Sequence, residues 1–238
     1  MPAVQAPWWQ SYACVGSATV LHVDLAPAPE REWAALTCLD EGELLRWSRF
    51  EYSGPRRQFV LSRAALRAVL CRELACGNDE LAFGVSAHGK PFARVRDRPA
   101  DISFSVSHGG WHGLIAFAPD GRLGVDIEER VERRRLDVLI DAALGTEERA
   151  EVASAQGPDR LQHFFKLWTM KEALQKADGR GIKLDATTFE IPRAVRHGEA
   201  GGTLELPQAP GVAWHVRDLG EERFAAAIAH DTVVGARP

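Results

Sequence analysis

Two kinds of hydrophobic pattern alternate along this chain. Apolar residues that recur every three or four positions predict amphipathic helices, and short apolar runs between turn residues predict strands. The helical pattern is found at 30–45, 57–74, 146–155 and 161–177. The strand pattern is found at 20–26, 102–106, 113–118, 123–128, 189–192, 202–206, 212–216 and 223–229. Gly77 is the expected stop signal after the second helix.

Each half of the chain therefore combines one or two helices with several short strands. A turn formed by Pro119, Asp120 and Gly121 lies near the middle. Such a mixture of elements is typical of an α+β protein. We predict two similar α+β subdomains, with residues 1–119 as the N-terminal and residues 120–238 as the C-terminal subdomain.

Composition and charge narrow the classes of function. A chain of 238 residues suffices for one large or two small domains, and its formal net charge of −4 argues against a general nucleic-acid binder. No stretch approaches the ~20 apolar residues of a membrane-spanning helix. The first residues lack the basic and apolar regions of a signal peptide, so we expect a cytoplasmic protein. The four cysteines form no CxxC pair and show no zinc spacing, and we expect them to be reduced.

The predicted strand at 123–128 carries two carboxylates. Asp126 and Glu128 alternate with Val125 and Ile127. Residues i and i+2 of a strand share a face, so we expect the apolar pair to face the core and the acids to face outward together. A divalent cation such as Mg²⁺ would relieve the repulsion between the acids. An edge strand with a polar outer face has the same spacing.

The predicted helix at 161–177 carries a third carboxylate. Glu172 and Lys176 lie four residues apart and therefore share a helix face. The pair suits a metal ligand followed, one turn later, by a phosphate contact. A surface Glu–Lys pair with no functional role has the same spacing.

A Ser-His-Gly-Gly segment, residues 107–110, lies between two predicted strands, where we expect a loop. Small residues let backbone N–H groups approach an anion, and Ser107 and His108 add side-chain donors. A hairpin turn with a hydrogen-bonded histidine would have the same sequence. A hydrolase nucleophile is disfavoured, because the chain has no GxSxG elbow and Ser107 directly precedes His108.

In this order, the three motifs resemble those of the Sfp-type 4′-phosphopantetheinyl transferases. That family carries a Ser-His loop, a G-[VI]-D-[IV]-E strand and an F-x-x-x-W-x-x-K-E-[AS]-x-x-K helix, which FSVSHGG, GVDIE and FFKLWTMKEALQK match here. A Gly-Lys-Pro turn at 89–91 and an arginine-bearing N-terminal region also match. The resemblance covers residues 45–185. It departs from the family where SHGGWH replaces SHSG, so the residue after His108 brings no hydroxyl.

The resemblance implies a fold and a reaction. The fold is a pseudo-twofold pair of α+β subdomains in one monomer, with the active site in the cleft between them. The reaction is the transfer of the 4′-phosphopantetheine of coenzyme A to a serine of an acyl, peptidyl or aryl carrier protein, releasing adenosine 3′,5′-bisphosphate. It is the reaction of a holo-[acyl-carrier-protein] synthase, depends on Mg²⁺ with Mn²⁺ as an alternative, and would serve polyketide, non-ribosomal peptide or fatty acid synthesis.

The matching positions also imply roles for individual residues. Asp126, Glu128 and Glu172 match the metal-binding acids, and Glu172 is also the candidate general base, acting directly or through water. Lys176 would contact phosphate and support the leaving group. The implied coenzyme A contacts are Arg46, Arg57, Lys90, Ser107, His108 and Lys176. Among these, His108 would contact the 3′-phosphate, and Lys90 would contact the adenine and phosphates. Arg56 or Arg63 could take the role of Arg46 or of Arg57.

The remaining expectations concern the partner and the helix. The segment 131–144 lies where the family receives its carrier protein, and Arg133–Arg135 could steer an acidic carrier helix, although a solvated charge run looks the same. Lys171 would make an ion pair or a phosphate contact, and Trp168 would anchor the core. Two other functions stay open: a non-catalytic module that binds coenzyme A or a nucleotide, and a metal-dependent phosphohydrolase that needs no carrier.

Overall fold

The computed structural model describes residues 7–180 and 184–231. The N-terminal half builds a four-stranded sheet whose neighbouring strands are antiparallel, in the order β1-β2-β7-β6. Its strands are β1 (Trp9–Val15), β2 (Ala18–Asp24), β6 (Ser103–Gly109) and β7 (His112–Ala118). A small sheet of β3 (Leu81–Val85), β4 (Pro91–Val95) and β5 (Arg98–Pro99) lies beside it, and the predicted turn at 89–91 joins β3 to β4.

Three helices belong to this half: α1 (Pro29–Leu36), α2 (Glu41–Ser48) and α3 (Ser53–Glu73). The single helix predicted at 30–45 is wrong, because Asp40 starts a new helix there. The Asp40 side chain accepts a hydrogen bond from the Glu43 amide, and the Glu43 side chain accepts one from the Asp40 amide. The long helix α3 is confirmed, but it ends before Ala75, which is left-handed at φ 49°, and not at Gly77.

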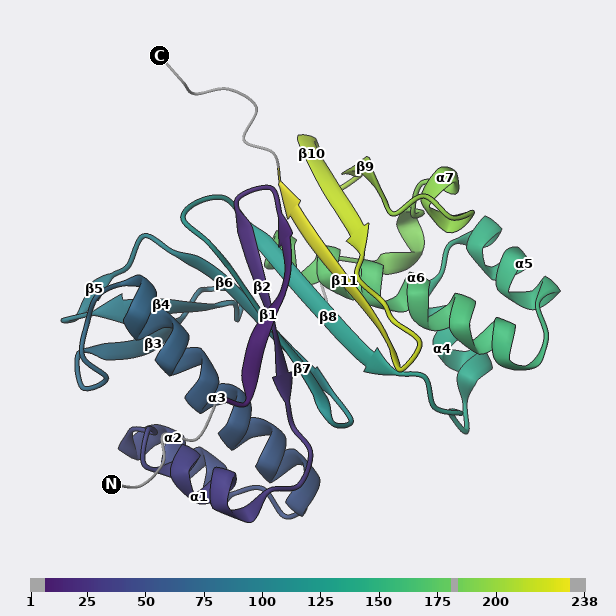
Figure 1. Ribbon diagram of the computed structural model, residues 1–238. Helices are drawn as coiled ribbons and strands as arrows, with labels where there is room; N and C mark the ends of the chain where they lie inside the picture. The colour runs from purple at the N-terminus through teal and green to yellow at the C-terminus, as the bar shows by residue number, and fades with distance from the viewer. Residues whose placement is uncertain (1–6, 181–183, 232–238) are drawn as a thin grey trace.

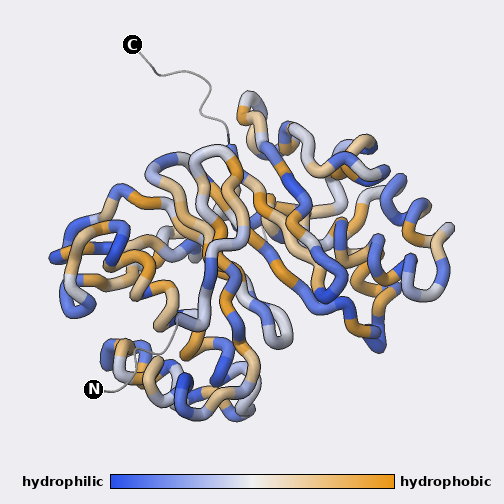
Figure 2. Tube along the Cα trace, in the orientation of Figure 1, coloured by the Kyte–Doolittle hydropathy of each residue, from blue (hydrophilic) through white to orange (hydrophobic). Residues whose placement is uncertain are grey.

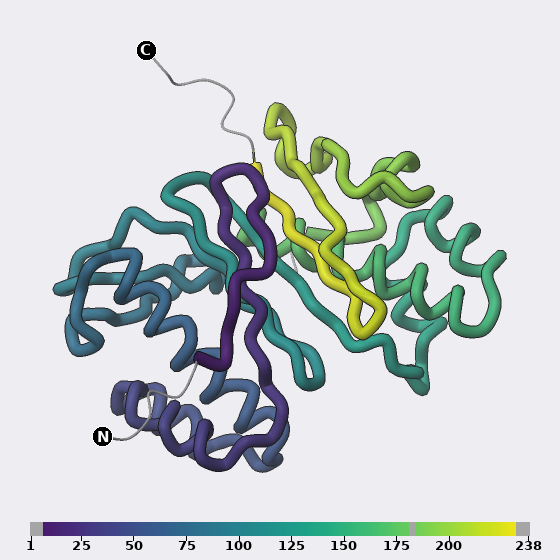
Figure 3. Tube along the Cα trace, viewed as in Figure 1, coloured from purple at the N-terminus to yellow at the C-terminus, as the bar shows by residue number. Residues whose placement is uncertain are grey.

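The C-terminal half builds a second antiparallel sheet in the order β8-β11-β10-β9. Its strands are β8 (Leu123–Glu129), β9 (Gly201–Leu206), β10 (Ala209–Asp218) and β11 (Phe224–Asp231). Its helices are α4 (Leu136–Ala143), α5 (Thr146–Ser154), α6 (Gly157–Asp178) and α7 (Arg193–Arg196), with a 3₁₀ turn at Ala186–Thr188. The tube in Figure 3 shows the two halves of the chain on opposite sides of the molecule.

The two sheets pack on each other at the centre of the molecule (Figure 1). The molecule has three hydrophobic cores: one between the two sheets, one between the first sheet and α3, and one between the second sheet and α6. Side chains alternate between the two faces of each strand, so neighbouring residues of a strand belong to different cores. Leu114 and Ala116 of β7 face the second sheet, while Ile115 and Phe117 face α3. In the second sheet Ala226 faces the first sheet, and its neighbours on β11 face α6. Figure 2 shows the hydrophobic residues concentrated along these central strands.

Several predictions of local structure are wrong. Residues 107–109 form the end of strand β6 and not a loop, so only Gly110 and Trp111 make the hairpin turn. The segment 189–192 is not a strand. Strand β1 and helix α4 were not predicted. Among the helices of the described chain, none has both the length and the apolar character needed to cross a bilayer. All four cysteines are free.

A pair of histidines lies where the two sheets meet. His22 on β2 and His112 on β7 share a hydrogen bond of 2.9 Å between Nε2 and Nδ1, and the His22 ring stacks on Phe224 of β11. Burial lowers the pKa of both imidazoles below the ordinary 6.5. The charged groups that face the pair are Asp24, Glu129, Glu221 and Arg223.

We expect this pair to make stability depend on pH. The unfolded chain binds protons at pH 6.5 more readily than the folded pair does, so stability is full above that pH and is lost as the pH falls towards the lowered pKa values. In His22→Gln the loss between pH 7 and pH 5 should be smaller than in the natural protein, as measured by urea unfolding. An equally steep loss in His22→Gln would contradict this, and His88→Gln at an exposed site is the control.

Candidate active site

The candidate site is built where helix α6 lies directly on strand β8. A Cβ built at Gly124 of β8 would stand 2.2 Å from the Ala173 carbonyl oxygen and 2.4 Å from the Ala177 nitrogen, which are both backbone atoms of α6. Only glycine permits this approach. Asp126 and Glu128 lie on the same face of β8 as Gly124. Because Gly124 has no side chain, α6 can lie close to this face and to both acids.

Asp126, Ser107 and Lys176 form a closed hydrogen-bonded cluster. Asp126 Oδ1 accepts from Ser107 Oγ and from Lys176 Nζ, each at 2.7 Å, and Lys176 Nζ lies 2.8 Å from Ser107 Oγ. These groups come from β8, β6 and α6. A hydrogen bond of 3.1 Å from the Val125 amide to Ser105 Oγ holds β6 beside β8. The predicted motifs are therefore in contact, although they lie up to 69 residues apart in sequence.

Asp126 does not face bulk water, as the sequence-based expectation had it, whereas the Glu128 side chain is 24% exposed. Asp126 is 4% exposed, and the cavity that it lines has a volume of about 290 Å³. Its wall is formed by Val106, Ser107, His108, Asp126, Glu128, Trp168, Glu172 and Lys176. The expectation failed because the outward face of β8 is covered by α6. Val125 and Ile127 do face the central core, as predicted.

Crowding of the carboxylates shapes the electrostatics of this cavity. Burial, with the Asp126 charge as the next cause, raises the pKa of Glu128 to about 7. The same two causes, in the same order, raise the pKa of Glu172. Two cations of the chain oppose this repulsion: Lys176 at Asp126, and Arg133, whose Nη2 lies 2.9 Å from Glu128 Oε2. The cavity thus concentrates negative charge that a bound cation would stabilise.

The donor set of the cavity fits a hard cation such as Mg²⁺. Asp126 Oδ2 is buried and has no hydrogen-bond partner within the described residues, so one carboxylate oxygen is left for a further ligand. Glu128 and Glu172 add carboxylate oxygens to the same cavity. Across residues 7–180 and 184–231, no three acidic, histidine or cysteine side chains are already drawn together as a metal site.

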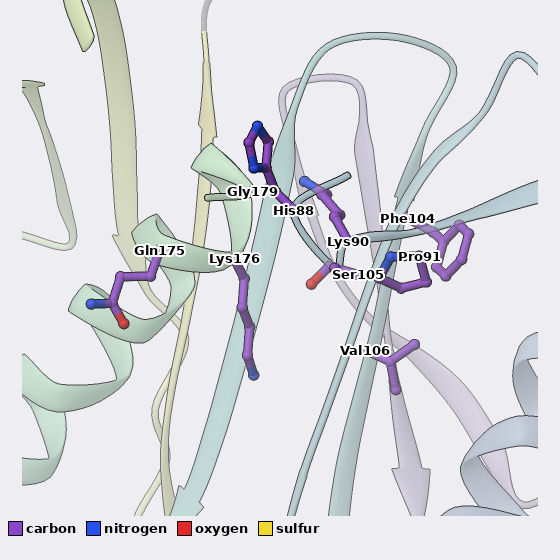
Figure 4. Close-up of a pocket in the computed structure, with 10 residues that line it drawn as sticks. His88, Lys90, Pro91, Phe104, Ser105, Val106, Gln175, Lys176 and Gly179 are labelled. Atoms are coloured by element: carbon purple, nitrogen blue, oxygen red, sulfur yellow. The ribbon is translucent and has the colours of Figure 1, made fainter. Parts of the chain in front are cut away.

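A second cavity of about 260 Å³ adjoins the first, and the two share Val106 and Lys176. It lies between the β3–β4 turn and the C-terminal end of α6 (Figure 4). Lys90 lines it, and so do His88, Gln175 and Gly179, which the motifs did not indicate. Phe104, Ser105 and Val106 of β6 are also in its wall. The two cavities form one cleft between the subdomains.

The remaining predicted contacts are only partly drawn together. His108 lies at the cleft and is exposed to solvent on one side, and desolvation by its neighbours followed by the Lys176 charge lowers the pKa of its imidazole. Arg46 is exposed at the end of α2, and its charge contributes to the same shift. Arg57 Nε instead donates to the Leu25 carbonyl oxygen at 2.9 Å. The Arg46 charge therefore acts on His108. The Arg57 side chain is instead bound, at least in part, to the backbone at Leu25.

Lys171 and Trp168, two further residues of the α6 motif, make contacts with the protein interior. Lys171 is 1% exposed, and its Nζ lies 2.7 Å from Glu148 Oε2 and donates to two backbone carbonyls. Of the two expectations for Lys171, the ion pair is confirmed and a phosphate contact does not fit this burial. Trp168 packs against the C-terminal core and also lines the cavity. Sequence reasoning missed Glu148, for which residue spacing gave no signal.

Comparison with known proteins assigns the family. Residues 26–120 match a family model described as 4′-phosphopantetheinyl transferase, N-terminal, and residues 122–229 match the 4′-phosphopantetheinyl transferase superfamily. The chain is 30% identical over 173 residues to the 4′-phosphopantetheinyl transferase HetI of Nostoc sp., covering 71% of this chain and 73% of that protein. This chain belongs to the 4′-phosphopantetheinyl transferase family. The resemblance inferred from the motifs is confirmed, as is the α+β fold with two sheet-containing subdomains.

Two further relatives agree with this assignment. A putative 4′-phosphopantetheinyl transferase of Synechocystis sp. is 33% identical over 144 residues, which span 60% of this chain and 58% of that protein. The 4′-phosphopantetheinyl transferase Sfp of Bacillus subtilis is 25% identical over 161 residues, 68% of each chain. The reaction of the family is the transfer of phosphopantetheine from coenzyme A to a carrier protein. The exact subdomain boundary at 119/120 and the roles of single residues stay predictions.

We expect Gly124→Ala to damage both stability and activity. The new methyl group would force α6 away from β8, which should cost about 1–3 kcal/mol of unfolding free energy. Because Glu172 and Lys176 would move with the helix, phosphopantetheine transfer should fall by about tenfold or more. Urea unfolding and a transfer assay measure the two effects. Gly54→Ala is the control, because a Cβ added at this helical position would meet no neighbouring group within 4 Å. Normal turnover in Gly124→Ala would contradict the prediction.

Proposed function

We propose that this chain transfers the 4′-phosphopantetheine of coenzyme A to a carrier-protein serine by means of the cluster around Asp126. The observation that supports this most is the meeting of Ser107, Asp126 and Lys176 within 2.8 Å of one another at the subdomain cleft. Acids and cations side by side suit the handling of a pyrophosphate, which needs both a cation and direct phosphate contacts. An unrelated surface pair or edge strand would not bring the three motifs together.

In this proposal Asp126, Glu128 and Glu172 would hold Mg²⁺, with Mn²⁺ as an alternative. When bound, such a cation neutralises charge on the pyrophosphate of coenzyme A. The residues of the chain supply the rest of the site. Ser107, His108 and Lys176 border the cleft where the phosphates would bind, and Arg46 lies close enough to His108 to affect its pKa.

The transfer itself is a displacement at phosphorus. The carrier serine oxygen forms a bond to the phosphorus that bears the pantetheine, and the bond from that phosphorus to the bridging oxygen breaks. Adenosine 3′,5′-bisphosphate leaves with the bridging oxygen. Glu172 accepts the serine proton directly or through water, and Lys176 stabilises charge on the phosphates. Because a carboxylate that also holds a cation is a weak base, a relay through water suits this role.

The carrier would approach over the segment 131–144, which includes α4 and is tied to the cavity by the ion pair of Arg133 with Glu128. Arg133 is already paired with Glu128, whereas Arg134 and Arg135 are exposed and could meet an acidic carrier helix. Whether the carrier is the acyl type of a holo-[acyl-carrier-protein] synthase, or a peptidyl or aryl one, is for a carrier panel to decide. The pathway, the cytoplasmic location and the monomeric state stay predictions from sequence.

The assignment is tested by mass spectrometry of carrier proteins. Purified protein with Mg²⁺, coenzyme A and an apo carrier should add the mass of one phosphopantetheine arm to the carrier. Asp126→Ala and Glu172→Ala should lose this activity and keep the fold, because each removes one acid from the cavity and leaves the cores intact. A folded Asp126→Ala protein with normal turnover would remove Asp126 from the site.

Two controls distinguish this function from the other two. Failure to modify any acyl, peptidyl or aryl carrier, together with tight binding of coenzyme A, would favour a non-catalytic binding module. Release of phosphopantetheine to water without a carrier would identify a phosphohydrolase. Measured specificity constants across the same panel would then identify the preferred carrier class.

We expect His108→Ala to weaken the binding of coenzyme A more than it lowers turnover. If His108 contacts the 3′-phosphate, the loss should shrink with dephospho-coenzyme A, which lacks that group. Isothermal titration of both compounds with the natural protein and with the variant measures the difference. An equal loss of affinity for both compounds would exclude the 3′-phosphate as the partner of His108.

A further inference from the structure

Lys90 crosses the cleft from one subdomain to the other. It lies in the β3–β4 turn of the N-terminal half, and its side chain reaches the end of α6 beside Gly179 (Figure 4). There Nζ donates to the carbonyl oxygens of Leu123 at 3.0 Å and Ala177 at 3.1 Å. The residue therefore contacts the backbone of β8 and of α6 at the same time.

These two carbonyls are unusual acceptors. Ala177 lies in the last turn of α6, where carbonyl groups have no partner within the helix and carry the negative end of the helix dipole. Leu123 is the first residue of β8, which is an edge strand of its sheet. A lysine ammonium satisfies both acceptors, and its charge is favourable at a helix C-terminus. Lys90, a residue of the N-terminal half, thus caps a helix of the C-terminal half.

The position of this contact matters because of what the two elements carry. Ala177 directly follows Lys176 and lies little more than one turn after Glu172, while Leu123 lies three residues before Asp126. Gly124 sets how closely α6 approaches β8, and Lys90 joins the two elements at one end of that contact. A shift of the helix end would move Lys176 relative to Asp126.

Neighbouring groups enclose the Lys90 side chain in this place. Its stem packs beside the left-handed Gly179, where an added Cβ would stand 3.2 Å from Lys90 Cδ. Burial, followed by the nearby charge of Arg122, lowers the pKa of Lys90 to about 8. Two of its three N–H donors are occupied by backbone.

We propose that Lys90 is a positioning residue that ties the end of α6 to the start of β8 and so fixes Lys176 and Glu172 relative to Asp126. This inference rests on the proposed function. It gives Lys90 a different role from the contact with adenine and phosphates that the family resemblance implies.

The test separates positioning from direct binding of coenzyme A. Lys90→Met should lower kcat by about tenfold or more, because the reacting groups are misplaced, and should change the KM for coenzyme A by less than about threefold. Lys90→Arg, which keeps donors for both carbonyls, should recover part of kcat. A Lys90→Met protein with normal kcat and a strongly raised KM that recovers with dephospho-coenzyme A would overturn the proposal.

Hydrogen exchange tests the same contact without any turnover. In Lys90→Met the amides of 176–179 should exchange about tenfold faster than in the natural protein, because the last turn of α6 loses its cap. Unchanged exchange there would also overturn the proposal. Lys166→Met is the matched control, since Lys166 lies on α6 and donates to the Val195 carbonyl at 2.8 Å but does not touch β8. If the natural protein modifies no carrier, the proposed function fails while this exchange result still decides the role of Lys90.

Discussion

The direct backbone contact between α6 and β8 is the constraint on which the rest of the site depends. A helix normally packs on a sheet through side chains on both surfaces. Here Gly124 has no side chain, and the helix backbone fills the space that a Cβ would need. Asp126 and Glu172 therefore line one cavity of about 290 Å³, where burial, followed by the Asp126 charge, raises the pKa of the glutamate. The glycine that opens the GVDIE motif is as much a part of the site as its acids.

This closeness creates an electrostatic problem that the chain solves with its own cations. Three carboxylates share one cavity, and burial followed by the charge of Asp126 raises the pKa of both glutamates. Lys176 lies against Asp126, and Arg133 lies against Glu128. Both cations belong to parts of the molecule that the proposed reaction also needs: helix α6, where Lys176 would contact phosphate, and the segment where a carrier would approach. Charge balance within the protein and charge balance with its substrates thus involve the same residues.

The sequence allowed the main elements, the fold class and the family to be predicted, because strong periodicity and ordered motifs are local properties. It did not show that β6 continues through Ser107 to Gly109, since the small residues there suggested a loop. It also placed Asp126 in solvent, because a single strand does not reveal which element covers its second face. The break at Asp40 was missed because the capping pair with Glu43 outweighs a continuous apolar pattern. Contacts such as Lys171 with Glu148 and Lys90 with Ala177 join distant residues, and no spacing rule predicts them.

The division of the site between the halves of the chain has a physical consequence. Ser107, His108 and Lys90 come from before the central turn, and Asp126 and Lys176 come from after it. In an isolated C-terminal half, Asp126 would lose the Ser107 hydroxyl, and the end of α6 would lose the Lys90 ammonium. The apolar faces of β8 and β11 would also be exposed, because their core partners are β2 and β7. The Ser107–Asp126–Lys176 cluster is therefore built from the same two halves that the packed sheets hold together, and neither half alone can form it.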